Sequence, residues 1–301
     1  MAIREGKHMK YTNNYDLPQS IVNAIVNDDY SSGKSNYSVT TLLSPPRIRL
    51  LKMKHNEELT EDVSDRIWTL LGQSVHTILE RANEDKEDMI TEKRYFAQLD
   101  GVTISGQTDT FSLGDKTLQD YKVTSVWTII FSQEGKPEWE QQLNCYAWLH
   151  KKNTGEDVKK LEIIAIARDW NKREKQRRSG DYPETAISVL EQKLWDYDEQ
   201  EKFIRERISV HEEAEKDFIF KNKLPMCSDE DRWKKDDTFR CMKKGRKTAV
   251  RVFKSKEEAD EYILSSKEQL YIEQQKGEAT RCSGNYCGVA DFCEQYQREC
   301  I

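Results

Sequence analysis

The chain has 301 residues, of which 34% are charged and 36% belong to the hydrophobic set, so it can bury a sizeable core and is too hydrophobic for intrinsic disorder. No apolar run approaches the ~20 residues that span a bilayer, and the first ten residues lack the apolar centre of a signal peptide, so we expect a soluble, cytoplasmic protein. The net charge of −6 argues mildly against a nucleic-acid binder, although local basic runs matter more than the total.

Residues 1–36 are polar and rich in Asn, Asp and Ser, and we expect a polar N-terminal arm there. Two prolines at positions 45 and 46 then interrupt regular structure. Arg47 follows them directly. It is a candidate phosphate contact or a surface arginine after a turn, and the sequence leaves both open.

Residues 61–82 predict an amphipathic helix, because apolar residues recur at helical spacing. His76 flanks the apolar stripe, and Gln73 and Glu80 lie on the same side of the helix. A histidine in this position is either a half-buried helix residue or part of a site. Glu92 opens the next predicted strand, where it is either an exposed strand-start carboxylate, the reading we favour, or a group that approaches a metal site.

Residues 106–122, GQTDTFSLGDKTLQDYK, predict a β-hairpin around a type II′ turn at Gly114-Asp115. Such a turn pairs residues whose numbers sum to 229, which places Asp109 opposite Asp120, roughly 5 Å apart. Lys122 lies on the face of Asp120. Two opposed carboxylates weaken a hairpin unless a cation lies between them, and oxygen ligands suit Mg²⁺ or Mn²⁺. The alternative is a solvated hairpin face with one ordinary ion pair.

Residues 137–151 predict a helix that opens on a proline. Gln142 and Tyr146 point the same way from it, since they are four residues apart. Residues 161–168 then read as a buried central strand. A basic stretch follows, which is either a phosphate contact or a solvated loop; its candidate residues are Arg168, Lys172, Arg173, Arg177 and Arg178.

A long helix is predicted over residues 183–218, and it ends a core that we place at residues 37–222. Residues 223–301 form a separate cysteine-rich module in this reading. Its sequence RCSGNYCGVADFC places Cys282, Cys287 and Cys293 close together, and four thiolates complete either a tetrahedral Zn²⁺ site or a [4Fe–4S] cluster. Cys227 and Cys300 compete for the fourth position.

These motifs, in this order, resemble the PD-(D/E)XK nuclease superfamily and its RecB-like and lambda-exonuclease-like branch, which includes phage and CRISPR-type exonucleases with a C-terminal cysteine cluster. The segment around His76, GQSVHTILE, resembles the helical histidine motif of that branch. Asp109 matches the first metal aspartate, and Asp120 with Lys122 matches the (D/E)-x-K pair, with Asp where many members have Glu. Gln142 and Tyr146 match the Q-x-x-x-Y motif.

The resemblance implies a mixed α/β, restriction-endonuclease-like core, in which a central β-sheet is flanked by helices. His76, Asp109 and Asp120 would hold Mg²⁺ or Mn²⁺, Lys122 would position a water, and Gln142 with Tyr146 would hold DNA or orient the catalytic groups. Cys227, Cys282, Cys287 and Cys293 would hold an iron–sulfur cluster. The chain has no cysteine before Cys145, which departs from relatives whose first cluster ligand lies far upstream.

The activity implied is a metal-dependent deoxyribonuclease, with an exonuclease expected before a structure-specific endonuclease or nickase. A DNA-binding adaptor without turnover is the alternative outside the enzymes. The setting implied is DNA recombination, repair or phage DNA processing in a bacterial or phage-infected cell, with a recombination or replication protein as a candidate partner.

Overall fold

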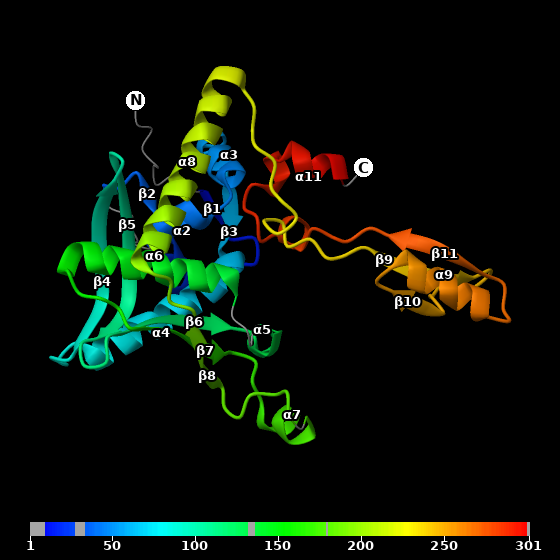
Figure 1. Ribbon diagram of the computed structural model, residues 1–301, viewed down its shortest axis with the longest axis horizontal. Helices are drawn as coiled ribbons and strands as arrows, with labels where there is room; N and C mark the ends of the chain where they lie inside the picture. Colours follow the sequence, from blue (N-terminus) through cyan, green and yellow to red (C-terminus); the bar gives the residue numbers. More distant parts are fainter. Residues whose placement is uncertain (1–9, 28–33, 132–135, 179, 300–301) are drawn as a thin grey trace. The chain divides into compact units, whose positions relative to one another are not determined.

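The computed structural model describes residues 10–27, 34–131, 136–178 and 180–299 (Figure 1). These fall into two units: a larger one with residues 10–49 and 60–223, and a smaller one with residues 50–59 and 224–299. None of the described helices is long and apolar enough to cross a membrane. Cys300 and much of the predicted N-terminal arm lie outside the described residues.

A mixed β-sheet forms the centre of the larger unit, and it confirms the predicted α/β class. Its described strands follow the order β2-β5-β6-β7-β8, with β4 paired to β5 off this path. The β2–β5 and β6–β7 pairs are parallel and the others are antiparallel. The strands are β2 (Tyr37–Ser38), β4 (Met89–Leu99), β5 (Val102–Ser112), β6 (Thr117–Thr124), β7 (Lys160–Ala167) and β8 (Ile187–Gln192).

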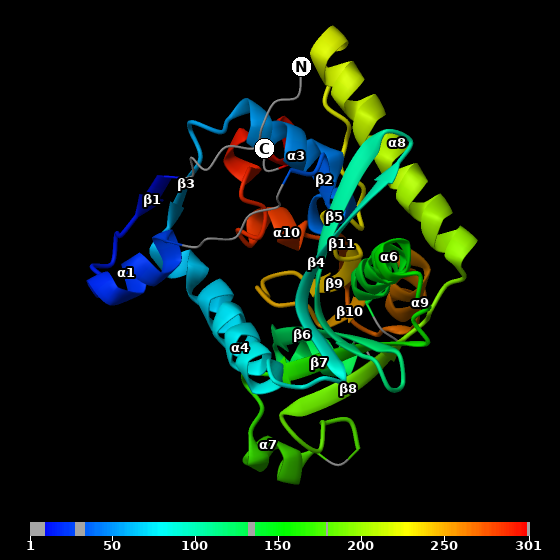
Figure 2. The ribbon, with the colours of Figure 1, turned by 90° about the vertical axis from the view of Figure 1, so that its left-hand side faces the viewer.

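Helices cover both faces of this sheet (Figure 2). One face packs on α6 and the other on α4, because Leu118 of β6 joins the α6 core while Tyr121, at an odd separation along the strand, contacts His76 of α4. The described helices of this unit, apart from α3, which spans both units, are α1 (Gln19–Val26), α2 (Val39–Leu43), α4 (Ile67–Asn83), α5 (Val126–Phe131), α6 (Pro137–Thr154), α7 (Lys172–Arg177) and α8 (Tyr197–Lys221); α3 is Pro46–Lys54.

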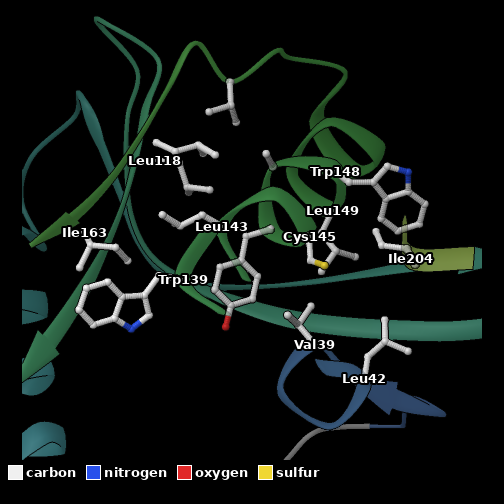
Figure 3. Close-up of a cluster of buried hydrophobic side chains, with 14 of the residues drawn as sticks. Val39, Leu42, Leu118, Trp139, Leu143, Cys145, Trp148, Leu149, Ile163 and Ile204 are labelled. Atoms are coloured by element: carbon white, nitrogen blue, oxygen red, sulfur yellow. The ribbon is translucent and has the colours of Figure 1, made fainter. Parts of the chain in front are cut away.

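The core lies between α6 and the strands (Figure 3). Leu143, Trp148 and Leu149 of α6 are fully buried, as are Leu118 and Ile163 of the sheet. Each such side chain contributes about 1.5–3 kcal/mol of transfer free energy when it leaves water. This burial fixes α6 against β5 and β6, the two strands that carry the predicted aspartates.

The predicted helix over residues 183–218 is wrong in its first third. Residues 187–192 form β8 instead, which pairs antiparallel with β7, and α8 begins only at Tyr197. The segment alternates between exposed and less exposed residues, which is the period of an edge strand, and the free edge of β7 decides its conformation. Asp196 then caps α8 by accepting a hydrogen bond from the backbone N–H of Glu199, 2.7 Å away.

The predicted helix over residues 61–82 also begins later than expected. Residues 60–62 form β3 (Thr60–Asp62), parallel to β1 (Lys10–Thr12), and a 3₁₀ turn, η1 (Val63–Arg66), precedes α4. Asp62 caps this turn by accepting from the backbone N–H of Ser64. The apolar stripe of α4 is only partly buried, and Ile78 keeps 56% of its surface exposed.

The smaller unit has its own three-stranded antiparallel sheet, in the order β10-β9-β11. Within the same unit, His55 stacks on Phe292 with ring centroids 4.4 Å apart. The described elements are β9 (Thr238–Lys243), β10 (Arg251–Phe253), α9 (Lys256–Ser265), β11 (Leu270–Gln275), α10 (Thr280–Ser283), η2 (Ala290–Phe292) and α11 (Glu294–Glu299). Ser255 caps α9, since its side chain accepts a hydrogen bond from the backbone N–H of Glu258.

Gly106 lets α6 approach β5 closely, and we expect Gly106→Ala to destabilise the protein. A Cβ at this position would lie 2.8 Å from the Tyr146 ring and 2.7 Å from Leu149, inside van der Waals contact. Overpacking of this kind costs about 1–3 kcal/mol in the free energy of unfolding, measurable by urea denaturation.

The matched control is Gly114→Ala, where a Cβ meets no atom within 4 Å and the backbone φ is not positive. We expect that variant to unfold like the parent chain. Equal midpoints for the two variants would contradict a close approach at Gly106.

Candidate active site at a fork between two strands

Strands β5 and β6 form a fork. They pair only through Thr110↔Gln119 and Phe111↔Leu118, which confirms the predicted register sum of 229. The ladder stops before Asp109 and Asp120, so the prediction that these two face each other within the ladder is wrong. Asp109 instead accepts, through Oδ2, a hydrogen bond from the backbone N–H of Tyr121, 2.7 Å away. A side-chain bond therefore replaces the next ladder bond where the strands diverge.

The turn of this hairpin also differs from the prediction. The strands end at Ser112 and begin again at Thr117, which leaves four residues, 113–116, in the loop. Lys116, rather than Gly114, has the left-handed backbone, with φ of 56°. The longer loop keeps the register because it remains centred between residues 114 and 115.

His76 reaches the fork from α4. Its Nδ1 lies 3.5 Å from Oδ1 of Asp109 and 3.2 Å from Oε1 of Glu92. Its ring also meets the ring of Tyr121 edge to face, with centroids 5.9 Å apart. The structure therefore brings the predicted histidine together with the first predicted aspartate.

Glu92 is the residue that sequence reasoning placed wrongly. It is a member of the site rather than an exposed strand end, since its side chain is only 14% exposed and lies against His76 and Gln107, whose Nε2 donates to Oε2 over 2.6 Å. Its backbone is left-handed, with φ of 46°, inside β4. Strain of this kind costs about 1–3 kcal/mol and is concentrated at functional sites. No pattern in the sequence signals it.

Three of these groups could hold a metal ion. One ligand atom each from His76, Glu92 and Asp109 lie within 4.8 Å of one another. Carboxylate oxygens with an imidazole nitrogen suit a hard or borderline divalent cation. Two of the three predicted ligands, His76 and Asp109, thus come together with Glu92, whereas Asp120 is not part of this group and its role as a ligand stays a prediction.

The electrostatics of the fork favour a cation. Burial, with the nearby charge of Asp120, raises the pKa of Asp109 to about 8. The hydrogen bond with Glu92 raises the pKa of His76, against the effect of burial. Burial opposes ionisation of Glu92, but hydrogen bonds from His76 and Gln107 together lower its pKa. Positive charge between these carboxylates would relieve the repulsion that burial intensifies.

Asp120 and Lys122 lie on the same face of β6, as predicted. Nζ of Lys122 is 2.6 Å from Oδ2 of Asp120, and the aspartate is only 2% exposed. Among the described residues, no donor makes a hydrogen bond of ordinary geometry to that buried Oδ2 atom. A buried carboxylate is costly without opposite charge beside it; Lys122 supplies one such charge to Oδ2, and a cation ligated at the fork would add another. The residues present therefore fit a divalent metal.

Gln142 and Tyr146 also come together as predicted. Nε2 of Gln142 donates to the Tyr146 hydroxyl over 2.8 Å, on the face of α6 that packs against β5 at Gly106. Their role toward DNA or the catalytic groups stays a prediction.

The predicted basic residues divide into two groups. Arg168 lies over the Trp68 ring and Arg178 over the Trp127 ring, with the guanidinium carbons 4.4 and 4.6 Å from the ring centroids. Both tryptophans are exposed, and Arg168 follows β7 directly, its N–H bonded to the carbonyl of Thr124 at the end of β6.

The other basic candidates differ in their accessibility. Lys172, Arg173 and Arg177 belong to α7, where Arg177 pairs with Glu174 at 2.8 Å. Arg47 is only 4% exposed, which contradicts a surface arginine and leaves little of its side chain accessible to a phosphate, so we leave it out of the proposed DNA contacts.

The four candidate cysteine ligands all lie in the smaller unit. Cys287 and Cys293 are buried, and Cys227 and Cys282 are half-buried. The Gln295 side chain bonds both the N–H and the carbonyl of Cys227, each at 2.9 Å, which ties Cys227 to the helix directly after Cys293. This arrangement is consistent with Cys227 as the upstream ligand, while the metal and its ligand set stay predictions.

Comparison with known proteins gives structural resemblances alone. No family model and no curated protein matches the chain. Among solved structures, the protein SSO0001 aligns at 17% identity with a TM-score of 0.43, over 63% of this chain and 84% of that one. A phage-related exonuclease from Haemophilus somnus aligns at 13% identity and a TM-score of 0.34, over 52% and 74%. An alkaline exonuclease from Laribacter hongkongensis aligns at 17% identity and a TM-score of 0.30, over 50% and 69%.

Glu92→Gln tests whether the carboxylate missed by sequence reasoning is a metal ligand. The change removes one negative charge and leaves an amide oxygen that can still accept from Gln107. We expect the affinity for Mn²⁺, measured by calorimetry, to fall about tenfold or more.

Glu80→Gln is the control, because Glu80 is an exposed carboxylate on the helix that carries His76. Its affinity for Mn²⁺ should equal that of the parent protein. A Glu92→Gln protein that binds as tightly as the control would remove Glu92 from the ligand set.

Proposed function

We propose that this protein is a metal-dependent deoxyribonuclease that acts as an exonuclease. The observation that carries the proposal is the fork itself: Asp109 and Asp120 are buried where β5 and β6 diverge, with His76, Glu92 and Lys122 against them. Several carboxylates buried together destabilise the folded state, so they contribute nothing to a purely structural role. A site that binds a cation and a phosphate requires them.

Each residue has a role in this proposal. Asp109, Asp120, His76 and Glu92 hold the metal, and bound Mg²⁺ or Mn²⁺ supplies Lewis-acid activation for phosphodiester hydrolysis. Lys122 Nζ, fixed by Asp120, orients the attacking water or offsets the negative charge that grows on the phosphate oxygens.

The rim of the site supports a nucleic-acid substrate. Trp68 lies eight residues before His76 on α4, roughly 12 Å along the helix, and Arg168 covers one face of its ring. Exposed tryptophans beside arginines can stack bases while the guanidinium groups meet phosphates. We therefore retain Arg168 and Arg178, with the α7 residues Lys172, Arg173 and Arg177, as proposed DNA contacts.

Gln142 and Tyr146 complete the proposed site as groups that hold the DNA strand or orient the catalytic residues. The support for this role is their mutual hydrogen bond on α6, the helix packed against the strand of Asp109.

The cysteine module is proposed to hold a [4Fe–4S] cluster through Cys227, Cys282, Cys287 and Cys293, with Zn²⁺ as the alternative. The setting proposed is recombination, repair or phage DNA processing, with a recombination or replication protein as partner.

Asp120→Asn should abolish nuclease activity. The change keeps the side-chain volume but removes the charge that the metal and Lys122 need, so we expect the rate to fall more than about a hundredfold. The assay uses end-labelled single- and double-stranded linear DNA beside a closed circle, with Mg²⁺ or Mn²⁺.

Metal-dependent loss of linear DNA alone, absent in the variant, identifies an exonuclease. Cutting of the circle identifies a structure-specific endonuclease or nickase on the same site. DNA that is bound but never cut identifies a binding adaptor and refutes the proposed activity.

Metal analysis of anaerobically purified protein tests the cysteine module. A [4Fe–4S] cluster predicts a brown protein with about four irons per chain, whereas a zinc site predicts a colourless one with about one zinc.

Cys227→Ala should lower the bound metal at least about twofold. The control is Cys241→Ala, a buried cysteine that instead faces α9, and it should keep its metal. Full metal content in Cys227→Ala would assign the fourth position to another residue.

A further inference from the structure

The smaller unit contains a segment of uniform positive charge that the proposed active site does not use. Residues 238–254, which we call the basic hairpin, consist of β9, β10 and the loop between them, and they contain seven Lys or Arg and no Asp or Glu. The chain as a whole has a net charge of −6. The hairpin is therefore an exception to the composition, and its charge is concentrated in a single two-stranded ribbon.

The tip of the basic hairpin is exposed to solvent. All residues of 243–248 are exposed, and four of the first five are basic, around Gly245, whose φ of 85° forms the turn. Lys243 pairs with Glu268 at 2.9 Å. Lys244 and Lys247 contact no carboxylate among the described residues. Basic side chains at this density repel one another, so a polyanion bound at the tip would relieve that repulsion.

The rest of the sheet determines which face of the basic hairpin is covered and which is open. Residues 256–275, which comprise α9 and β11, contain six acidic and two basic residues. Helix α9 covers one face of the sheet, where Cys241 of β9 is buried and its Sγ contacts the carbonyl of Ala259. Helix α9, which carries four of these acidic residues, thus covers one face and leaves the other for a polyanion, although Glu273 of β11 lies on that other face beside Arg240.

The open face carries side chains suited to contact. Val252 and Tyr271 are 53% and 50% exposed, and both lie at the alternate register positions from the covered residue Cys241. Arg240 shares this face and lies 3.7 Å from Glu273. A face of this kind offers apolar and cationic groups side by side, as protein surfaces that read DNA grooves do.

The base of the sheet is tied to the cysteine-bearing segments. Asp237 accepts from the backbone N–H of Gly277 over 2.8 Å, and Lys234 forms a β-bridge with Ala279. The segments that join here lead to Cys227 on one side and Cys282 on the other. The sheet is thus held at its base by the module, while the tip of the basic hairpin extends from the other end (Figure 1).

We propose that the basic hairpin is a duplex-DNA-binding arm, which meets the phosphates with its tip and a groove with its open face. Strands of a β-ribbon or β-sheet can enter the major groove of B-DNA, which is about 12 Å wide; here β9 is flanked by β10 and β11. The inference rests on the proposed function for its choice of DNA as the polyanion. It adds a binding site outside the strand fork, one that holds the duplex part of a substrate.

The test measures binding without turnover. Every protein carries Asp120→Asn, and a fluorescent DNA duplex is titrated by anisotropy over a range of salt concentrations. The arm variant adds Lys244→Glu with Lys247→Glu. We expect the affinity to fall at least tenfold, and the slope of log K against log salt to become shallower by about 2, because two phosphate contacts are lost.

The matched control adds Lys256→Glu with Lys276→Glu, which changes the net charge equally at the base of the same sheet. We expect its affinity to change less than about twofold and its salt slope to stay the same. All four lysines are exposed, and equal thermal midpoints confirm that each protein is folded.

The outcomes separate this proposal from the proposed function. Equal losses in the two variants, or no loss in either, would overturn the arm. Tip-dependent binding to vesicles of anionic lipid with unchanged DNA binding would overturn it in favour of a membrane surface. Restoring Asp120 then tests catalysis. If the tip substitutions weaken DNA binding but no DNA is cleaved, the nuclease is refuted and the arm is retained. If DNA is cleaved but the tip substitutions leave binding unchanged, the arm is refuted and the nuclease is retained.

Discussion

The divergence of β5 and β6 is the constraint on which the candidate site depends. The two strands exchange ladder hydrogen bonds at only two residue pairs, and a side-chain bond from Asp109 to the backbone of Tyr121 takes over where the ladder ends. Because β6 continues as a parallel partner of β7, its course is set by the sheet rather than by the hairpin. The two strands therefore separate at this point, and Asp109 and Asp120 are each held by a different strand.

Packing outside the fork offsets the energetic cost of its buried charge and strained backbone. Buried carboxylates and the left-handed backbone of Glu92 both raise the free energy of the folded state. The packing of α6 on the sheet opposes them, since Leu143, Trp148 and Leu149 are fully buried there. The close approach at Gly106 shows how little space separates the helix from the strand. A dense core on one side thus supports a destabilised site at its edge.

The proposed functions of the two units are electrostatically distinct. In the larger unit, negative charge converges at the fork, which suits a cation, and arginines lie over exposed aromatic rings. In the smaller unit, positive charge collects on one hairpin while the helix behind it is acidic. A net charge of −6 hides both features, because opposite local charges cancel in the sum. Local patterns of charge, rather than the total, therefore indicate what each unit can bind.

The sequence by itself determined the α/β class, the register of the central hairpin, the shared faces of Asp120 with Lys122 and of Gln142 with Tyr146, and the pairing of His76 with Asp109. The register and the shared faces follow from local periodicity, whereas the α/β class and the pairing of His76 with Asp109 were implied by the resemblance of the motifs to a known nuclease superfamily. Only the tertiary structure decided that residues 187–192 pair with β7, that the ladder stops before Asp109, and that Glu92 belongs to the site. Those outcomes depend on a free sheet edge, on the path of a third strand and on one strained φ angle, and none of them leaves a periodic trace in the sequence.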